Sequence, residues 1–169
     1  MFEQDAVLSH LTDPTWFVLE VGPGGHPTPW SGPYESIDRT EPGQPGSAGS
    51  EAGVTCTATR HGEMHDLPYG DETFDALVAR HLIEHHPDTL LVLREWARVL
   101  KPGGVLVIVT PDQRNFRGNT VALDPTHQAA FTAEQLQALA AHAGFGDFAV
   151  SFIDWPRPGW SFCLRAVRS

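Results

Sequence analysis

The chain has 169 residues, of which 41% are hydrophobic and 19% charged, a composition typical of one globular domain. Its 11 Lys and Arg against 21 Asp and Glu give a net charge of −10, which argues against binding to nucleic acid or to an anionic membrane surface. The N-terminus has no basic start or apolar signal core, and no apolar run is long enough to span a membrane. We therefore expect one cytoplasmic domain over residues 1–169.

The order of apolar runs predicts strands that alternate with helices. Short apolar runs closed by glycines are typical of strands buried on both faces of a parallel sheet, whereas apolar residues three or four apart indicate a helix. In chain order we expect a helical turn at 5–8, strands at 16–21, 34–38, 54–59 and 74–79, a helix at 88–100, a strand at 105–109, a helix at 132–143 and antiparallel strands at 148–152 and 161–167. This order predicts an α/β sandwich with a mostly parallel sheet.

Two segments of the N-terminal half leave little room for helices. Residues 26–33 contain three prolines and a glycine between the first two strands, where a crossover helix is usual. Residues 40–53 are rich in Gly, Pro and Ser and have no apolar periodicity, so we expect a flexible loop there.

A glycine-rich turn and an acid indicate a site for a nucleoside-containing cofactor. The first strand leads into Glu20-Val21-Gly22-Pro23-Gly24, and the second strand ends at Asp38. Ligands bind beyond the carboxyl ends of strands in open α/β sheets, and an acid at the end of the second strand can accept hydrogen bonds from ribose hydroxyls. Pro27 stands where a dinucleotide fingerprint has its third glycine, which favours a cofactor without a pyrophosphate. A plain turn with a solvated acid stays an alternative.

These residues resemble the class I S-adenosylmethionine-dependent methyltransferases. The resemblance is carried by VLEVGPGG at 18–25, GEMHDLPYGDETFDALVARHLIEHHPD at 62–88, LREWARVLKPGGVLVIVTPD at 93–112 and the HQAAFTAEQLQALAAHAGF segment that follows. It implies one Rossmann-like domain whose seven-stranded, mostly parallel sheet has an antiparallel last strand. The proline-rich segment and the 40–53 loop take the place of two family helices, so we expect fewer helices in the N-terminal half.

The resemblance also implies S-adenosyl-L-methionine as the cofactor and assigns its contacts. Glu20, Gly22 and Gly24 are expected to line its methionine end, and Asp38 to bind its ribose. Glu63 would bond the adenine amino group, Met64 would cover the adenine ring, and Arg80 and His81 would lie against the cofactor. The expected activity is methyl transfer to a small-molecule acceptor. The alternative is a methyltransferase-like module that binds the cofactor without catalysis and acts in a larger assembly.

Nine histidines also suggest a metal site. HLIEH, from His81 to His85, matches the HxxEH pattern of zinc hydrolases, in which Glu84 would serve as a base. That pattern needs a long helix and a distant acidic ligand, whereas here it links a strand to the helix start at Asp88. We therefore expect no metal.

His127 is the candidate catalytic residue. It lies between the fifth strand and the last helix, in the region that covers the ligand edge of the sheet. An imidazole titrates near neutral pH, so His127 can remove a proton from an acceptor or orient it. A histidine that only bonds the loop backbone fits this position equally well.

Overall fold

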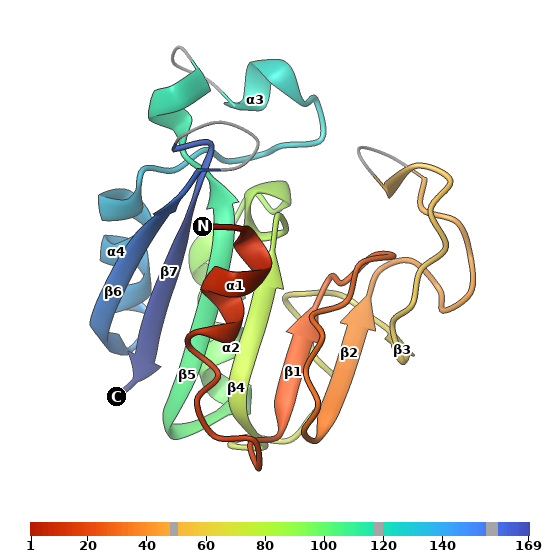
Figure 1. Ribbon diagram of the computed structural model, residues 1–169, viewed down its shortest axis with the longest axis vertical. Coiled ribbons are helices and arrows are strands. Elements are labelled where there is room, and N and C mark those ends of the chain that lie inside the picture. The colour runs from red at the N-terminus through yellow and green to blue at the C-terminus, as the bar shows by residue number, and fades with distance from the viewer. Residues whose placement is uncertain (48–50, 117–119, 155–158) are drawn as a thin grey trace.

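The computed structural model describes residues 1–47, 51–116, 120–154 and 159–169. Seven strands and the helices between them follow the alternation that the sequence predicts (Figure 1). The elements are α1 (Glu3–Leu8), β1 (Val18–Val21), β2 (Tyr34–Asp38), β3 (Arg60–His61), β4 (Phe74–Arg80), the 3₁₀ turn η2 (Ile83–His85), α2 (Thr89–Val99), β5 (Leu100–Pro111), the 3₁₀ turn η3 (Gln113–Phe116), α3 (Thr120–Leu123), α4 (Ala133–His142), β6 (Phe145–Ile153) and β7 (Ser161–Arg168).

The seven strands form one sheet in the order β3-β2-β1-β4-β5-β7-β6. The first five strands in this order pair in parallel. β7 runs antiparallel to both of its neighbours, β5 and β6. The predicted α/β fold, with a mostly parallel seven-stranded sheet and a reversed last strand, is confirmed.

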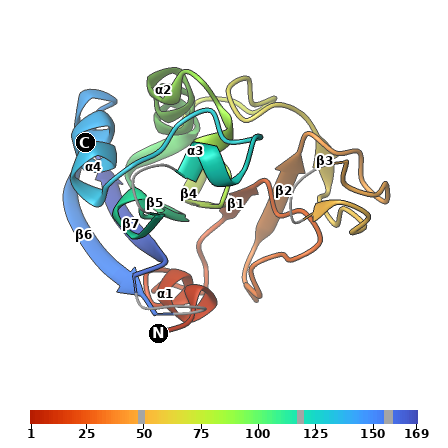
Figure 2. The same ribbon diagram turned by 90° about the horizontal axis from the view of Figure 1, so that it is seen from above.

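Helices cover the two faces of the sheet unequally (Figure 2). α2 and α4 pack on one face, where Leu19, Leu77 and Leu106 belong to the larger apolar cluster. On the opposite face α1 contributes Ala6 and Val7 to a smaller cluster. The described residues contain no α-helix between β1 and β2 or between β2 and β3, which confirms the expected reduction of helices in the N-terminal half.

The two longer helices begin at the predicted caps. The Asp88 side chain accepts a hydrogen bond from the Leu91 amide at 2.9 Å at the start of α2. Thr132 and Gln135 form a reciprocal capping box at the start of α4. No helix among the described residues has both the length and the apolar character that a membrane span requires.

The predicted strand at 54–59 is wrong. β3 consists only of Arg60 and His61, and Thr55 forms an isolated bridge with Pro45. The backbone amides of this segment bond elsewhere, since Cys56 donates to the Gln44 carbonyl at 2.8 Å and Thr57 donates to the Gly24 carbonyl at 2.8 Å. The β-branched pattern therefore belongs to a segment that packs on the glycine-rich turn.

The predicted flexible loop at 40–53 lies against the same turn. Gly46 donates to the Val54 carbonyl at 2.9 Å, and the Gly25 amide donates to the Glu51 carboxylate at 2.9 Å. Residues 48–50 lie outside the described residues. The mobility of this loop stays a prediction.

Candidate active site

A cavity of about 860 Å³ lies at the carboxyl ends of the parallel strands. Its position is the ligand-binding edge of an open α/β sheet, and its volume suits a nucleoside-sized cofactor together with a small acceptor. The predicted site residues that line it are Gly22, Gly24, Asp38, Glu63, Met64, His81 and His127. The lining also includes Glu51, Leu82, Glu84, His85, Asp124, Thr126 and Trp160.

The glycine-rich turn and Asp38 form one hydrogen-bonded unit at this edge. Gly22 and Gly24 have φ angles of +71° and +54°, in the left-handed region that favours glycine. The Asp38 carboxylate accepts hydrogen bonds from the amides of Gly24 at 3.0 Å and Thr40 at 2.8 Å. These bonds fix the acid beside the turn, and each carboxylate oxygen keeps a further acceptor position.

Glu20 and Arg80 pair with each other and are not among the cavity-lining residues. Side chains alternate along β1, so Val21 lines the cavity while Glu20 lies on the other face of the sheet. The Glu20 carboxylate is buried and accepts hydrogen bonds from the Thr28 amide at 2.7 Å, the Tyr34 hydroxyl at 2.6 Å and the Arg80 guanidinium at 3.0 Å. These two residues therefore support the segment that follows the glycine-rich turn.

α2 holds the wall of the cavity that carries Glu63 and Met64. The indole Nε1 of Trp96 donates to the Met64 carbonyl at 2.9 Å. The Glu95 carboxylate accepts from the Leu67 amide at 2.7 Å, so this segment is held to α2 at two points. Trp96 is fully buried, so the donor of its hydrogen bond to Met64 is held in one position.

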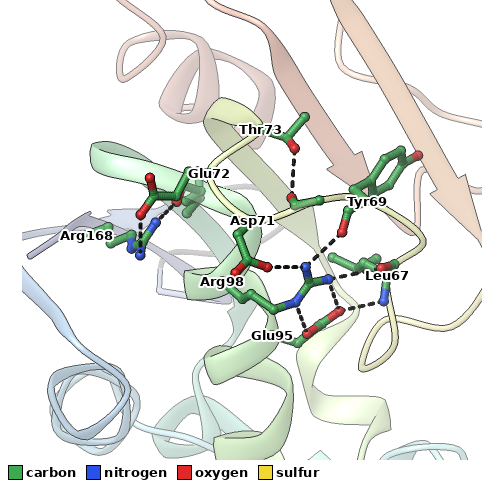
Figure 3. A network of polar contacts seen from close by, with 10 residues as sticks. Leu67, Tyr69, Asp71, Glu72, Thr73, Glu95, Arg98 and Arg168 are labelled. Carbon is green, nitrogen blue, oxygen red and sulfur yellow. Dashed lines mark hydrogen bonds and ion pairs between the residues drawn. The ribbon is translucent and has the colours of Figure 1, made fainter.

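Arg98 completes this attachment (Figure 3). Its guanidinium donates to the carbonyls of Leu67 at 3.1 Å and Tyr69 at 2.8 Å, and pairs with Glu95 at 2.7 Å and Asp71 at 2.8 Å. The hydrogen bond from Arg98, together with that from the Leu67 amide, lowers the pKa of Glu95 although burial opposes this shift. Segment 63–71 is thus fixed to α2 through charge-assisted hydrogen bonds.

His81 lies at the cavity in a strained backbone conformation, with a φ of +49°. Its Nε2 bonds to the Glu3 carboxylate of α1 at 2.8 Å, and its Nδ1 lies 3.7 Å from Glu84. Burial disfavours the charged imidazole, but the two carboxylates outweigh burial and raise the pKa of His81 to about 10. His81 is therefore a cation held between two acids.

His127 faces His85 across the cavity lining. Their rings meet edge to face, with centroids 4.8 Å apart. Burial lowers the pKa of His127, and the nearby His85 adds to this effect, so the imidazole is neutral at neutral pH. A neutral imidazole can accept a proton, as the predicted role of His127 requires.

The sequence interpretation missed Glu51 and the position of Glu84. The Glu51 carboxylate packs against Gly24 and accepts a hydrogen bond from the Gly25 amide. Glu51 lies in the segment that the sequence predicts as a flexible loop, and no motif there marks it as a site residue. The sequence places Glu84 only in the HxxEH pattern, whereas in the structure it is buried and accepts a hydrogen bond from the Thr110 hydroxyl of β5 at 3.0 Å. The positions of both residues at the cavity depend on burial and on partners distant in sequence, and a local sequence pattern shows neither.

Part of the chain is similar in sequence to known methyltransferases. Residues 39–108 match the family model described as "Methyltransferase domain". A "Probable S-adenosylmethionine-dependent methyltransferase" of Mycolicibacterium smegmatis is 38% identical over 87 residues, which cover 51% of this chain and 34% of that protein. A demethylmenaquinone methyltransferase of Halalkalibacterium halodurans is 46% identical over 54 residues, which cover 32% of this chain and 22% of that protein.

A solved structure shares the whole fold. A SAM-dependent methyltransferase from Thermotoga maritima superposes with a TM-score of 0.76 over 99% of this chain and 88% of that chain, at 22% identity. The chain has the fold of a SAM-dependent methyltransferase, and about half of its sequence is similar to proteins described as S-adenosylmethionine-dependent methyltransferases. It spans about a third of the length of the mycobacterial relatives that it matches. The cofactor that this methyltransferase family implies is S-adenosyl-L-methionine.

Proposed function

We propose that this chain binds S-adenosyl-L-methionine in the cavity and transfers its methyl group to a small-molecule acceptor. The observation that carries the proposal is the position of Asp38, which lines the cavity at the end of β2 and is tied to the glycine-rich turn. The turn also suits such a cofactor, because Gly22 and Gly24 line the cavity without side chains and leave their backbone open to close approach.

Each lining residue has a proposed role toward the cofactor. Asp38 accepts hydrogen bonds from the ribose hydroxyls, Glu63 accepts one from the adenine amino group, and Met64 covers the ring. When bound, the cofactor supplies a methyl group already activated by its sulfonium. The protein then contributes mainly orientation and exclusion of water. Glu20 and Arg80 act as positioning residues, since they support the turn from outside the cavity.

The proposed acceptor is a small molecule that lies near His127. One relative is named for the methylation of demethylmenaquinone, which is consistent with a small acceptor for this chain. The net charge of −10 disfavours nucleic acid as the acceptor. Where the acceptor must lose a proton, neutral His127 is the proposed base, because it lines the same cavity.

Calorimetric titration with S-adenosylmethionine and with its demethylated product tests the cofactor assignment. Asp38→Ala should lower the affinity for both ligands by about ten- to hundredfold, because the charge-assisted hydrogen bonds to the ribose are lost. Asp5→Ala, which removes an exposed acid of α1, is the matched control and should bind as the wild-type chain does. Unchanged affinity in folded Asp38→Ala would show that the cofactor assignment is wrong.

Turnover separates the enzyme from the alternative module. An assay of transfer of an isotopically labelled methyl group to small oxygen, nitrogen, carbon and sulfur nucleophiles should give a labelled product that His127→Ala forms more slowly. Tight binding of S-adenosylmethionine without transfer to any acceptor of these classes would instead favour the non-catalytic module.

A further inference from the structure

Three residues with metal-binding side chains meet on the cavity. Glu84 and His85 belong to η2, and His127 belongs to the segment between α3 and α4. One ligand atom of each residue lies within 4.8 Å of the ligand atoms of the other two. All three residues line the cavity.

Two polar atoms of this cluster are buried without a hydrogen-bond partner. The side chain of Glu84 is 1% exposed, and its Oε2 accepts a hydrogen bond from Thr110 at 3.0 Å. Its Oε1 has no hydrogen-bond partner and lies 3.7 Å from Nδ1 of His81. Nδ1 of His127 is also buried and without a partner. Buried polar atoms in native proteins are nearly always satisfied, so the unpartnered Nδ1 of His127, beside a carboxylate oxygen with no hydrogen bond, indicates a missing ligand at this cluster.

The surroundings of the cluster orient its side chains as metal ligands. Nδ1 of His85 donates to the Thr126 carbonyl at 3.1 Å, which leaves Nε2 as the free electron-pair donor. The Asp124 carboxylate lies 3.8 Å from Nε2 of His127, which is beyond hydrogen-bond distance. A carbonyl behind a histidine is a usual support of a metal ligand, and His85 has one.

Backbone hydrogen bonds join the two segments that carry the cluster. The amides of Gln128 and Ala129 both donate to the Glu84 carbonyl, at 2.8 and 3.0 Å. The segment that follows His127 is therefore fixed to η2 before any ligand arrives. This arrangement lowers the cost of bringing the three side chains together.

We propose that Glu84, His85 and His127 bind one divalent first-row transition-metal ion. Two imidazoles and one carboxylate are a donor set for zinc or iron, with positions left open. Ligands about 2.1 Å from a tetrahedral ion lie about 3.4 Å apart, so side-chain shifts of about 1 Å close the site.

This set differs from the HxxEH pair that the sequence suggested. His81 bonds to Glu3 at 2.8 Å and is not part of the cluster, while His127 comes from a distant segment. The site revises the expectation of no metal. The open positions of the ion would face the cavity, where a metal would bind an acceptor oxygen or nitrogen and lower its pKa. This role toward an acceptor rests on the proposed function, and with the ion bound His127 is a ligand and no longer the base.

Metal titration of the chelator-treated full chain tests the site without S-adenosylmethionine. Calorimetry with Zn²⁺ and absorption spectroscopy with Co²⁺ should each give one saturable site per chain. His85→Ala and His127→Ala should each weaken this site by more than about tenfold, and Glu84→Gln should do the same. His86→Ala is the matched control, since His86 adjoins His85 in sequence, bonds Asp88 at 3.0 Å and is not part of the cluster.

The outcomes separate the metal site from the cofactor site. One equivalent of metal that survives His86→Ala but is lost in His127→Ala supports the proposal, whatever the affinity for S-adenosylmethionine. Circular dichroism identifies any variant that does not fold. If His85→Ala or Glu84→Gln, both in η2, does not fold, His127→Ala decides, because it changes a different segment. Absence of a saturable site, or a site unchanged in both folded His85→Ala and folded His127→Ala, overturns the proposal. Failure to bind S-adenosylmethionine overturns only the proposed function.

Discussion

At Gly22 the backbone is left-handed, and the space over its Cα is occupied by Leu82. Replacing Gly22 with Ala should therefore cost about 1–2 kcal/mol of stability from the φ angle alone. The added methyl group should also displace Leu82 within the cavity lining. The affinity for S-adenosylmethionine should then fall by more than about tenfold. Denaturant unfolding and calorimetric titration measure the two effects.

Gly103→Ala separates backbone strain from the cavity. Gly103 has a φ of +77°, and a Cβ there would meet nothing within 4 Å. This control should lose similar stability but keep its affinity for S-adenosylmethionine. Equal losses of affinity in the two variants would mean that Gly22 acts through global stability and not through the cavity.

At the scale of an element, α2 acts as the support of the cavity wall at 63–71, and Glu95 supplies a pH-dependent part of that support. Its pKa lies below the ordinary value of 4.5, chiefly because Arg98 donates to the carboxylate. A carboxylate with a depressed pKa stabilises the fold above its unfolded pKa, and this contribution is lost as the pH falls through the folded pKa. Stability supplied by Glu95 should therefore be lost below about pH 4.5, over the interval in which the folded carboxylate takes up its proton.

Glu95→Gln isolates this contribution. The variant should be less stable than the wild-type chain at pH 7 and should approach it as the pH falls, so its melting temperature should depend less on pH. Asp5→Asn, on the exposed face of α1, should follow the wild-type curve. Parallel curves for wild type and Glu95→Gln across this interval would contradict the assigned role of Glu95.

The elements that the sequence predicts well are those whose signals are local. α2 and α4 begin with cap residues, and β4 and β5 are apolar runs, so periodicity and caps suffice to find them. The strand predicted at 54–59 failed because its amides bond to residues far away in sequence, among them Gly24. Alternation alone does not distinguish a strand from an extended segment that packs on a turn.

The site residues that the sequence predicts are likewise those placed by local signals. Asp38 and the glycine-rich turn follow the strands that position them, so the sequence and the family resemblance locate them together at the cavity. Buried Glu20 pairs with partly exposed Arg80 outside the cavity, an arrangement that depends on side-chain direction along β1. The cluster of Glu84, His85 and His127 was not predictable, because a fold brings its members together from two segments.

At the scale of the whole molecule, α1 is the only helix on its face of the sheet among the described residues. Val7 is fully buried there, packed in the smaller apolar cluster. Val7→Ala should therefore destabilise the chain by about 1–3 kcal/mol through lost burial and a cavity. Leu8→Ala, at a partly buried neighbour in the same helix, should cost less.

Chemical denaturation of the two variants measures the difference. Near-equal losses would show that α1 contributes to stability through its ends, such as the Glu3 bond to His81, and not through its apolar face.

β7 has a further consequence for how the chain folds. It is the last strand in sequence, yet it lies between β5 and β6 and supplies the pairing edge of both. Until residues 161–168 are in place, β5 and β6 each present unpaired backbone groups, which are templates for association with another chain. The sheet therefore closes late, by contacts between segments distant in sequence, and folding is expected to be slow for a domain of this size. A chain that ends before β7 would have two open strand edges, and aggregation would compete with folding.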